Sequence, residues 1–83
     1  MAKKKTWKII EKKLGREDAV GMTYKGSYVV YVDPRLDGFE RLDCLIHELS
    51  HNVYPEVEED YINERSTKIA EGLWKDGWRR VLQ

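Results

Sequence analysis

The stretch Asp37–Pro55, DGFERLDCLIHELSHNVYP, has the pattern of an amphipathic helix with a clear start and end. Asp37 is a favoured N-cap residue, and Glu40 follows it at the spacing of a capping box. Pro55 marks the end of the helical pattern. Between them, apolar residues recur at helical spacing and form one stripe: Leu42, Leu45, Ile46, Leu49 and Val53. The sequence therefore predicts a helix at about residues 38–53.

Both histidines of the chain, His47 and His51, lie in this helix, and Glu48 directly follows the first of them. Residues four apart are separated by about 40° around a helix, so both imidazoles can reach one ion. Glu48 points to a different side, where it can take a proton from a water molecule that the ion activates. This HExxH pattern predicts a zinc site with Glu48 as general base. Two exposed helix histidines are the simpler alternative.

A catalytic zinc ion needs a third protein ligand and keeps a fourth position for water. Since the chain has no third histidine, we expect a carboxylate from a second helix, which should begin at about residue 57 and stop near Asp76-Gly77. The predicted inner face of this helix is Ile62, Ser66, Ile69 and Leu73, with Ala70 and Trp74 at its margin. Glu59 and Glu58 flank that face, whereas Glu64 points away from it. We select Glu59 as the third ligand and Glu58 as the second choice; an ordinary N-terminal helix acid is the alternative.

Other residues near the motif have weaker claims to a function. Cys44 lies one turn before the first histidine, but three ligands from one helix would strain the geometry, so we expect a small buried thiol. Tyr54 and Tyr61 are candidates to donate a hydrogen bond to a developing oxyanion, although packing is the simpler role. Trp74 and Trp78 are four residues apart and should pack the C-terminal segment; an exposed pair would instead mark a partner surface.

The N-terminal part of the chain predicts strands. TWKIIEKKL at residues 6–14 mixes β-branched, aromatic and charged residues, and AVGMTYKGSYVVYVDP at residues 19–34 reads as a hairpin with its turn at residues 25–27. The second arm of this hairpin is apolar on both faces. Strands followed by two helices predict an α+β fold, with an antiparallel sheet of about three strands in a single domain, residues 1–83.

Composition argues against several classes of function. Lys plus Arg and Asp plus Glu each number 15, so nothing indicates electrostatic binding to nucleic acid or to an anionic membrane. The basic cluster Lys3–Lys5 is not followed by the apolar stretch of a signal peptide, and no run approaches the roughly 20 residues of a membrane span. The single cysteine, Cys44, fits a reducing compartment. We therefore expect a cytoplasmic monomer or small homo-oligomer.

An ordered set of short motifs covers residues 28–79, most of the chain. It comprises Asp33-Pro34 at a strand end, LIHELSH in the first helix, Pro55, Glu59 with Ile62 at the start of the second helix, and Leu73-Trp74 with Gly77-Trp78 near its end. This set resembles the small HExxH proteins common in phage genomes, called minimal zincins or mini metallopeptidases.

Two further similarities concern the third ligand. Glu59-x-x-Ile62-Asn63 is similar to the Glu-x-x-Ala-Asn helix that supplies this ligand in repressor-cleaving metallopeptidases of mobile elements. The run Asn63–Thr67 is similar to the Asn-Glu-x-x-Ser of thermolysin-like enzymes, with its serine one place early. That second similarity would nominate Glu64, against the helix phase.

The resemblance implies a zincin fold and zinc-dependent hydrolysis of a peptide or protein substrate. His47, His51 and Glu59 would hold zinc, and Glu48 would be the catalytic base. In zincins a sheet edge aligns the extended substrate, and we expect Tyr28–Val32 to be that edge. Two other functions remain open: a non-catalytic zinc-stabilised protein-interaction domain, and a metal-free interaction protein that uses the Trp-rich end.

Overall fold

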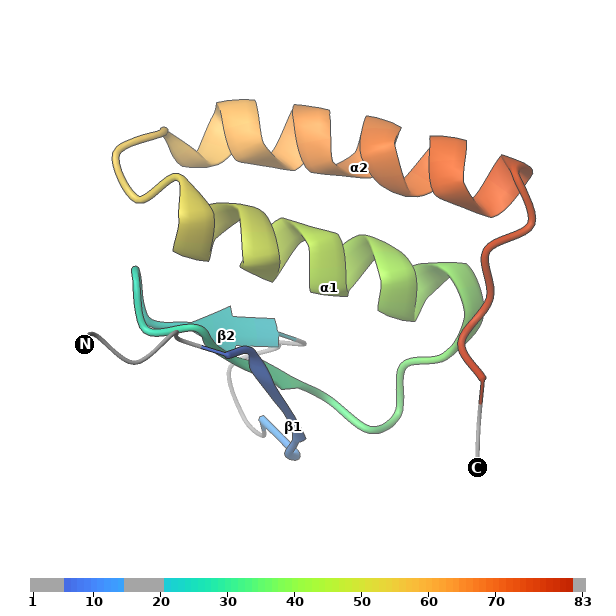
Figure 1. Cartoon of the computed structure of the whole chain (residues 1–83), viewed down its shortest axis with the longest axis horizontal. Coiled ribbons are helices and arrows are strands. Elements are labelled where there is room, and N and C mark those ends of the chain that lie inside the picture. The colour runs from blue at the N-terminus through green and yellow to red at the C-terminus, as the bar shows by residue number, and fades with distance from the viewer. Residues whose placement is uncertain (1–5, 15–20, 82–83) are drawn as a thin grey trace.

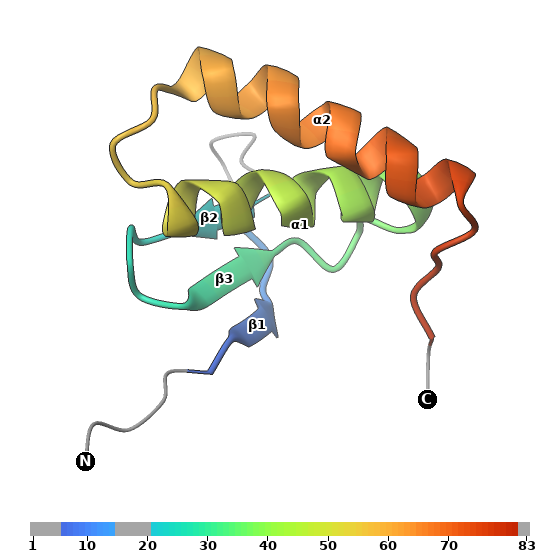
Figure 2. The same cartoon turned by 45° about the horizontal axis from the view of Figure 1, so that its top comes forward.

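The computed structural model describes residues 6–14 and 21–81, in which three strands precede two helices. The strands are β1 (Lys8–Glu11), β2 (Gly21–Thr23) and β3 (Val29–Val32), and the helices are α1 (Gly38–Val53) and α2 (Glu59–Lys75). Figures 1 and 2 show α1 lying between the sheet and α2. The predicted α+β fold is confirmed. The basic cluster Lys3–Lys5 and the first two residues of the predicted hairpin, 19–20, lie outside the described residues.

The sheet has the strand order β1-β3-β2 and is mixed. β2 pairs with β3 in antiparallel register, as a hairpin requires, whereas β1 pairs with the other side of β3 in parallel. The prediction of a wholly antiparallel sheet is therefore wrong for β1, because the pattern within one strand carries no information on the direction of its neighbour. β3 is the central strand, and both of its faces are apolar, which is typical of an interior strand. The expectation that Tyr28–Val32 forms a sheet edge is also wrong.

The core lies between β3, α1 and α2. Val30 and Val32 are fully buried, and the alternate residues Val29 and Tyr31, on the opposite face of the sheet, are partly exposed. Among the described residues, the buried apolar side chains are Val30, Val32, Ile46, Ile62 and Ala70. So small a core makes each buried polar contact important for stability.

The start of α1 and the end of α2 differ in how closely they follow the predicted local chemistry. α1 begins after Asp37, which occupies the N-cap position but makes no side-chain capping hydrogen bond, so the predicted capping box does not form. Gly77 ends α2 as predicted: its φ of +96° suits glycine, and its N–H donates to the Trp74 carbonyl at 3.0 Å. The N–H of Trp78 donates to the Leu73 carbonyl at 3.1 Å, which completes a Schellman motif.

The two helices pack along a row in which one isoleucine is followed by two small residues. α2 buries Ile62, Ser66 and Ala70, so the helices approach each other closely along the i, i+4 row. The predicted seam residue Ile69 is 53% exposed, and Val53 of the predicted α1 stripe is 52% exposed; both assignments are wrong. A helical wheel predicts the direction in which a side chain points, but it does not give the size of the side chains on the facing helix. Here the small residues Ser66 and Ala70 occupy the contact between α1 and α2, and Ile69 lies outside it.

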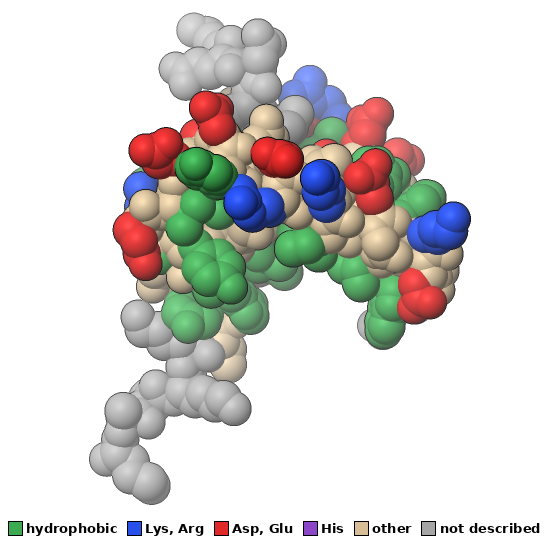
Figure 3. Space-filling view, turned by 90° about the horizontal axis from the view of Figure 1, so that it is seen from above, with side chains coloured by type: hydrophobic (Ala, Val, Ile, Leu, Met, Phe, Trp, Pro, Cys, Tyr) green, Lys and Arg blue, Asp and Glu red, His purple; other side chains and the backbone are tan. Residues whose placement is uncertain are grey.

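The outer surface of α2 is rich in charged residues, with some exposed apolar side chains among them. Figure 3 shows acidic and basic side chains interspersed along this face of the molecule. Glu64 and Lys68, four residues apart, form one such pair at 3.5 Å. In the described part of the chain, no helix combines the length and the apolar character that crossing a membrane requires.

Candidate metal centre

Two helix ends come together to form the candidate metal centre. His47 and His51 stand one turn apart on the C-terminal half of α1. A short connection, residues 54–58, then reverses the chain, with the N–H of Val57 donating to the Tyr54 carbonyl at 3.1 Å. Because this connection is short, Glu59, the first residue of α2, returns beside the two imidazoles.

A second contact fixes how α2 lies along α1. The hydroxyl of Thr67 donates to the Asp43 carboxylate at 2.9 Å, two turns further along α2 from Glu59. Together with the buried row Ile62, Ser66 and Ala70, this hydrogen bond sets the register between the helices. The position of Glu59 is therefore a consequence of helix packing as well as of the connection.

The structure brings together the three predicted ligands. The Nε2 atoms of His47 and His51 are 3.1 Å apart. Glu59 spans them, with Oε1 3.0 Å from His47 Nε2 and Oε2 2.5 Å from His51 Nε2. Within the described residues these three side chains form a group whose donor atoms all lie within 4.8 Å of one another. Ligand atoms around a tetrahedral zinc ion are roughly 3.3 Å apart, so the group has the dimensions of a metal site.

The surroundings of this group suit a bound cation. The side chains of His47 and His51 are 19% and 15% exposed, while that of Glu59 is 65% exposed. Two imidazoles and one carboxylate supply only donor atoms that zinc prefers. The exposed side of Glu59 leaves the group accessible to solvent. The three side chains can therefore hold a metal ion and still admit a further ligand.

Glu48 lies beside the ligand group but outside it. It is half-buried against the start of β2, where a Cβ atom on Gly21 would lie 2.9 Å from Glu48 Cγ and 3.0 Å from Oε2. Burial raises the pKa of Glu48, the charges of His47 and His51 act in the opposite direction, and Glu59 raises it further. Glycine at position 21 thus leaves room for a carboxylate between the two histidines and the outermost strand.

Cys44 shares this corner with Glu48, since its Sγ atom also approaches the Cβ position of Gly21. Burial raises the pKa of the Cys44 thiol to about 11, and the neighbouring carboxylates of Glu48 and Asp43 add to the effect. Cys44 is therefore a neutral thiol at physiological pH, as expected for a packing residue, and it is not part of the ligand group.

The rival acidic residues lie elsewhere. Glu58 is the N-cap residue of α2 and is exposed, and it does not join the group formed by the described residues. Glu64 faces solvent and pairs with Lys68 at 3.5 Å, as its helix phase predicts. The structure thus brings Glu59, and neither alternative, to the two histidines.

Tyr54 and Tyr61 line a groove between the helices together with Ile62 and Ile69. The guanidinium of Arg65 stacks over the Tyr61 ring at 4.7 Å. Both tyrosines are more than half exposed. A role in oxyanion stabilisation stays a prediction for either residue.

Asn52, directly after the second histidine, was not among the predicted residues. It is 2% exposed, and it ties α1 to the β2–β3 turn. Its Nδ2 donates to Thr23 Oγ1 at 2.7 Å and to the Tyr24 carbonyl at 3.0 Å, and its Oδ1 accepts from the Tyr28 N–H at 3.1 Å. Its backbone carbonyl accepts from the Gly26 N–H at 3.2 Å. A buried amide beside the candidate metal centre thus holds the hairpin in place.

The fold and the site define an α+β protein with a His-His-Glu group at the meeting point of two helix ends. Comparisons with protein-family models, with curated proteins and with solved structures gave no match. The similarity to minimal zincins therefore remains a prediction from the sequence.

Proposed function

We propose that the protein is a zinc-dependent metallopeptidase of the HExxH type. The observation that carries the proposal is the convergence of His47, His51 and Glu59 on one point. Two histidines and one glutamate are a ligand set of catalytic zinc sites, which keep the fourth position open. A carboxylate beside the ligands but outside their group, that of Glu48, fits a proton acceptor and has no evident use in a purely structural site.

Each protein group has a separate task in this proposal. A zinc ion supplies Lewis-acid chemistry, since it lowers the pKa of water towards about 7 and polarises a carbonyl group. His47, His51 and Glu59 hold the ion, and their positions on two packed helices limit how far they can move. Glu48 accepts a proton from the attacking water and delivers it to the leaving amine of the substrate.

An extended peptide substrate is best placed along β2. In the strand order β1-β3-β2, both β1 and β2 are outer strands, and β2 has no second strand partner among the described residues, so an added strand can pair with its outer edge. β2 begins at Gly21, next to Glu48, which would bring a bound peptide close to the proton acceptor. This edge replaces Tyr28–Val32, whose strand is paired on both sides.

The substitution Glu48→Gln tests the proposal. It keeps the size of the side chain and removes its basicity, so cleavage should fall by about 100-fold to 10,000-fold while zinc content stays the same. Wild type and variant are compared on a proteome-derived peptide library by mass spectrometry, with metal content measured on the same samples. Glu64→Gln, an exposed glutamate on α2, is the matched control and should retain activity. Equal cleavage by Glu48→Gln and wild type would contradict the assigned base.

A non-catalytic zinc-stabilised interaction domain is the second candidate, and the small core favours it. The buried apolar residues found among residues 6–14 and 21–81 are few, so a metal ion that binds only the folded state would raise stability appreciably. In that case zinc would raise the melting temperature, and neither wild type nor Glu48→Gln would cleave any peptide.

A further inference from the structure

A cavity lies at the end of the helix pair opposite the metal centre. It has a volume of about 700 Å³ and is formed where the start of α1, the end of α2, the segment after α2 and β1 meet. Its wall is mostly apolar and includes Leu42, Leu45, Leu73 and Trp78. Cavities of roughly 300–1,000 Å³ with apolar walls and a few polar groups are typical sites for small organic molecules.

Arg41 contributes an unusual polar group to this cavity. The residue is 8% exposed, and its Nη1 atom is buried without a hydrogen-bond partner among the described residues. The Oε1 atom of Glu11 lies 3.3 Å from Nη1, which is an ion-pair distance, but the pair lacks hydrogen-bond geometry. A guanidinium has five N–H donors, and a buried donor without an acceptor is rare in folded proteins. Arg41 lines the cavity, so its guanidinium brings a positive charge to this end, together with a buried donor that has no hydrogen-bond partner among the described residues.

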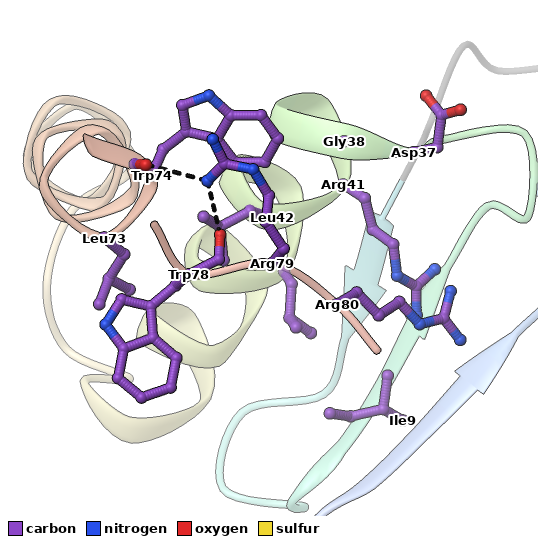
Figure 4. A pocket seen from close by; sticks show the side chains of 11 residues that line it. Ile9, Asp37, Gly38, Arg41, Leu42, Leu73, Trp74, Trp78, Arg79 and Arg80 are labelled. Carbon is purple, nitrogen blue, oxygen red and sulfur yellow. Dashed lines mark hydrogen bonds between the residues drawn. The ribbon is translucent and has the colours of Figure 1, made fainter. Parts of the chain in front are cut away.

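A second guanidinium adds to this charge. Arg80 Nη1 lies 3.0 Å from the same Oε1 atom of Glu11, so one carboxylate serves two cations. Figure 4 shows the guanidinium groups of Arg41 and Arg80 side by side near Ile9, whereas the carboxylate of Asp37 points away from them. Counted over the described residues, this end of the cavity has an excess of positive charge, and it favours an anion.

The remaining arginine of the cavity holds its wall in place. The Arg79 guanidinium stacks on the Trp74 ring at 3.4 Å and donates to the Trp74 carbonyl at 2.9 Å and to the Trp78 carbonyl at 2.8 Å. The Trp74 ring also packs edge-on against Phe39, with ring centroids 5.8 Å apart. The segment after α2 is thereby fastened beside the cavity, so that the apolar wall exists before a ligand binds.

We propose that this cavity binds a small amphiphilic carboxylate. The carboxylate group pairs with the half-exposed guanidinium of Arg80 and with that of Arg41, which turns its buried Nη1 toward the ligand on binding, since planar guanidinium groups match the geometry of a carboxylate. The apolar chain of the ligand lies along Leu42, Leu45 and Leu73. The site involves none of the candidate metal ligands, so the proposal is independent of the peptidase proposal.

Decanoate is the probe for this site, because it joins one carboxylate to an unbranched apolar chain. The full chain is titrated with decanoate below its micelle concentration, by calorimetry and by the fluorescence of Trp78 and the other tryptophans. We expect one saturable site, with decan-1-ol binding about tenfold more weakly because it lacks the charge. Saturable binding with equal affinities for acid and alcohol would overturn the role of the arginines, and a lack of saturable decanoate binding would overturn the site.

Three variants locate the binding. Arg41→Met and Arg80→Met should each weaken decanoate binding by about tenfold and leave decan-1-ol unaffected, whereas the control Arg65→Met, on α2 away from the cavity, should leave both unchanged. Circular dichroism verifies folding, and if Arg41→Met does not fold, the half-exposed Arg80 carries the test. Leu73→Trp keeps every charge but fills the cavity, so it should abolish binding of both probes. Wild-type affinity for decanoate in Arg80→Met or in Leu73→Trp would overturn the proposal.

Discussion

The two ends of α1 carry opposite kinds of chemistry. At its C-terminal end, His47 and His51 meet Glu59, and the next residue, Asn52, has hydrogen bonds from both atoms of its amide. At its N-terminal end, Arg41 lines a mostly apolar cavity, and its buried Nη1 atom has no hydrogen-bond partner within the described part of the chain. One end of the helix thus contributes two histidines to a polar group that Glu59 of α2 completes, and the other end borders a mostly apolar space.

The two sites also differ in how far apart their residues lie in the sequence, and this decides whether a sequence motif can reveal them. The candidate metal ligands fall between residues 47 and 59, so the spacing within one helix, one short connection and the packing of two consecutive helices assemble them. The cavity draws on residues from Ile9 to Arg80, which only the complete fold brings together. A site of the first kind leaves a short motif, and a site of the second kind leaves none.

The largest effect should come from disrupting the candidate metal centre. Glu59→Ala removes one of the three proposed ligands, so zinc affinity should fall by about 100-fold or more. Competition with a chromophoric chelator measures this change, and Glu64→Ala is the control because its carboxylate pairs with Lys68 on the exposed face of α2. If instead Glu64→Ala lowered zinc affinity and Glu59→Ala did not, the ligand would be Glu64. The prediction that Glu59 faces the histidines and Glu64 faces solvent would then be wrong.

The next effect concerns what holds this end against the sheet. Asn52→Ala removes the hydrogen bonds that join α1 to the β2–β3 turn, and it should lower the free energy of unfolding by about 2–4 kcal/mol. Urea denaturation measures the change, with Asn63→Ala, an exposed asparagine of α2, as the control. Since Asn52 is not a ligand, the folded variant should keep its zinc affinity to within a few-fold. An unchanged unfolding midpoint would show that the hairpin does not depend on this residue.

Local patterns predicted the two helices and the three side chains that form the candidate metal centre. α1 has the predicted bounds because periodicity and Pro55 are local signals, and the helix phase separated Glu59 from Glu64. The direction of β1 and the exposure of Ile69 were not predictable in this way, because they depend on partners that are distant in sequence.

The hydrophobic pattern of the sequence also did not predict which polar residues are buried. Asn52 and Arg41 interrupt apolar positions of α1, and a pattern of hydrophobic residues treats such interruptions as exposed. In the structure both residues are buried. The amide of Asn52 has hydrogen-bond partners, whereas Nη1 of Arg41 has none among the residues that the structure describes. A polar residue in the buried face of a predicted helix is therefore a signal worth testing, although its partner cannot be inferred without the fold.

The smallest expected effect is a pH dependence of stability, which should distinguish the two ends of α1. Asp33, buried in the connection that leads to the N-terminal end of α1, accepts hydrogen bonds from Arg35 Nε at 2.8 Å and from the Arg35 backbone N–H at 2.9 Å. These bonds hold the pKa of Asp33 well below its usual range. The unfolded chain binds a proton on this residue at about pH 3.9, whereas the folded chain does not, so its contribution to stability is present above that pH and is lost as the pH falls further.

Comparing Asp33→Asn with wild type by urea denaturation at pH 7 and pH 3 isolates this contribution. The difference in unfolding free energy should be larger at pH 7 and smaller at pH 3, because an asparagine does not titrate. The difference between Asn52→Ala and wild type should be the same at both values, since an amide at the metal-binding end has no proton to gain. If the stability differences of Asp33→Asn and Asn52→Ala depended equally on pH, Asp33 would not stabilise the fold through its charge. The ion pair with Arg35, whose side chain is largely exposed to solvent, would then contribute little.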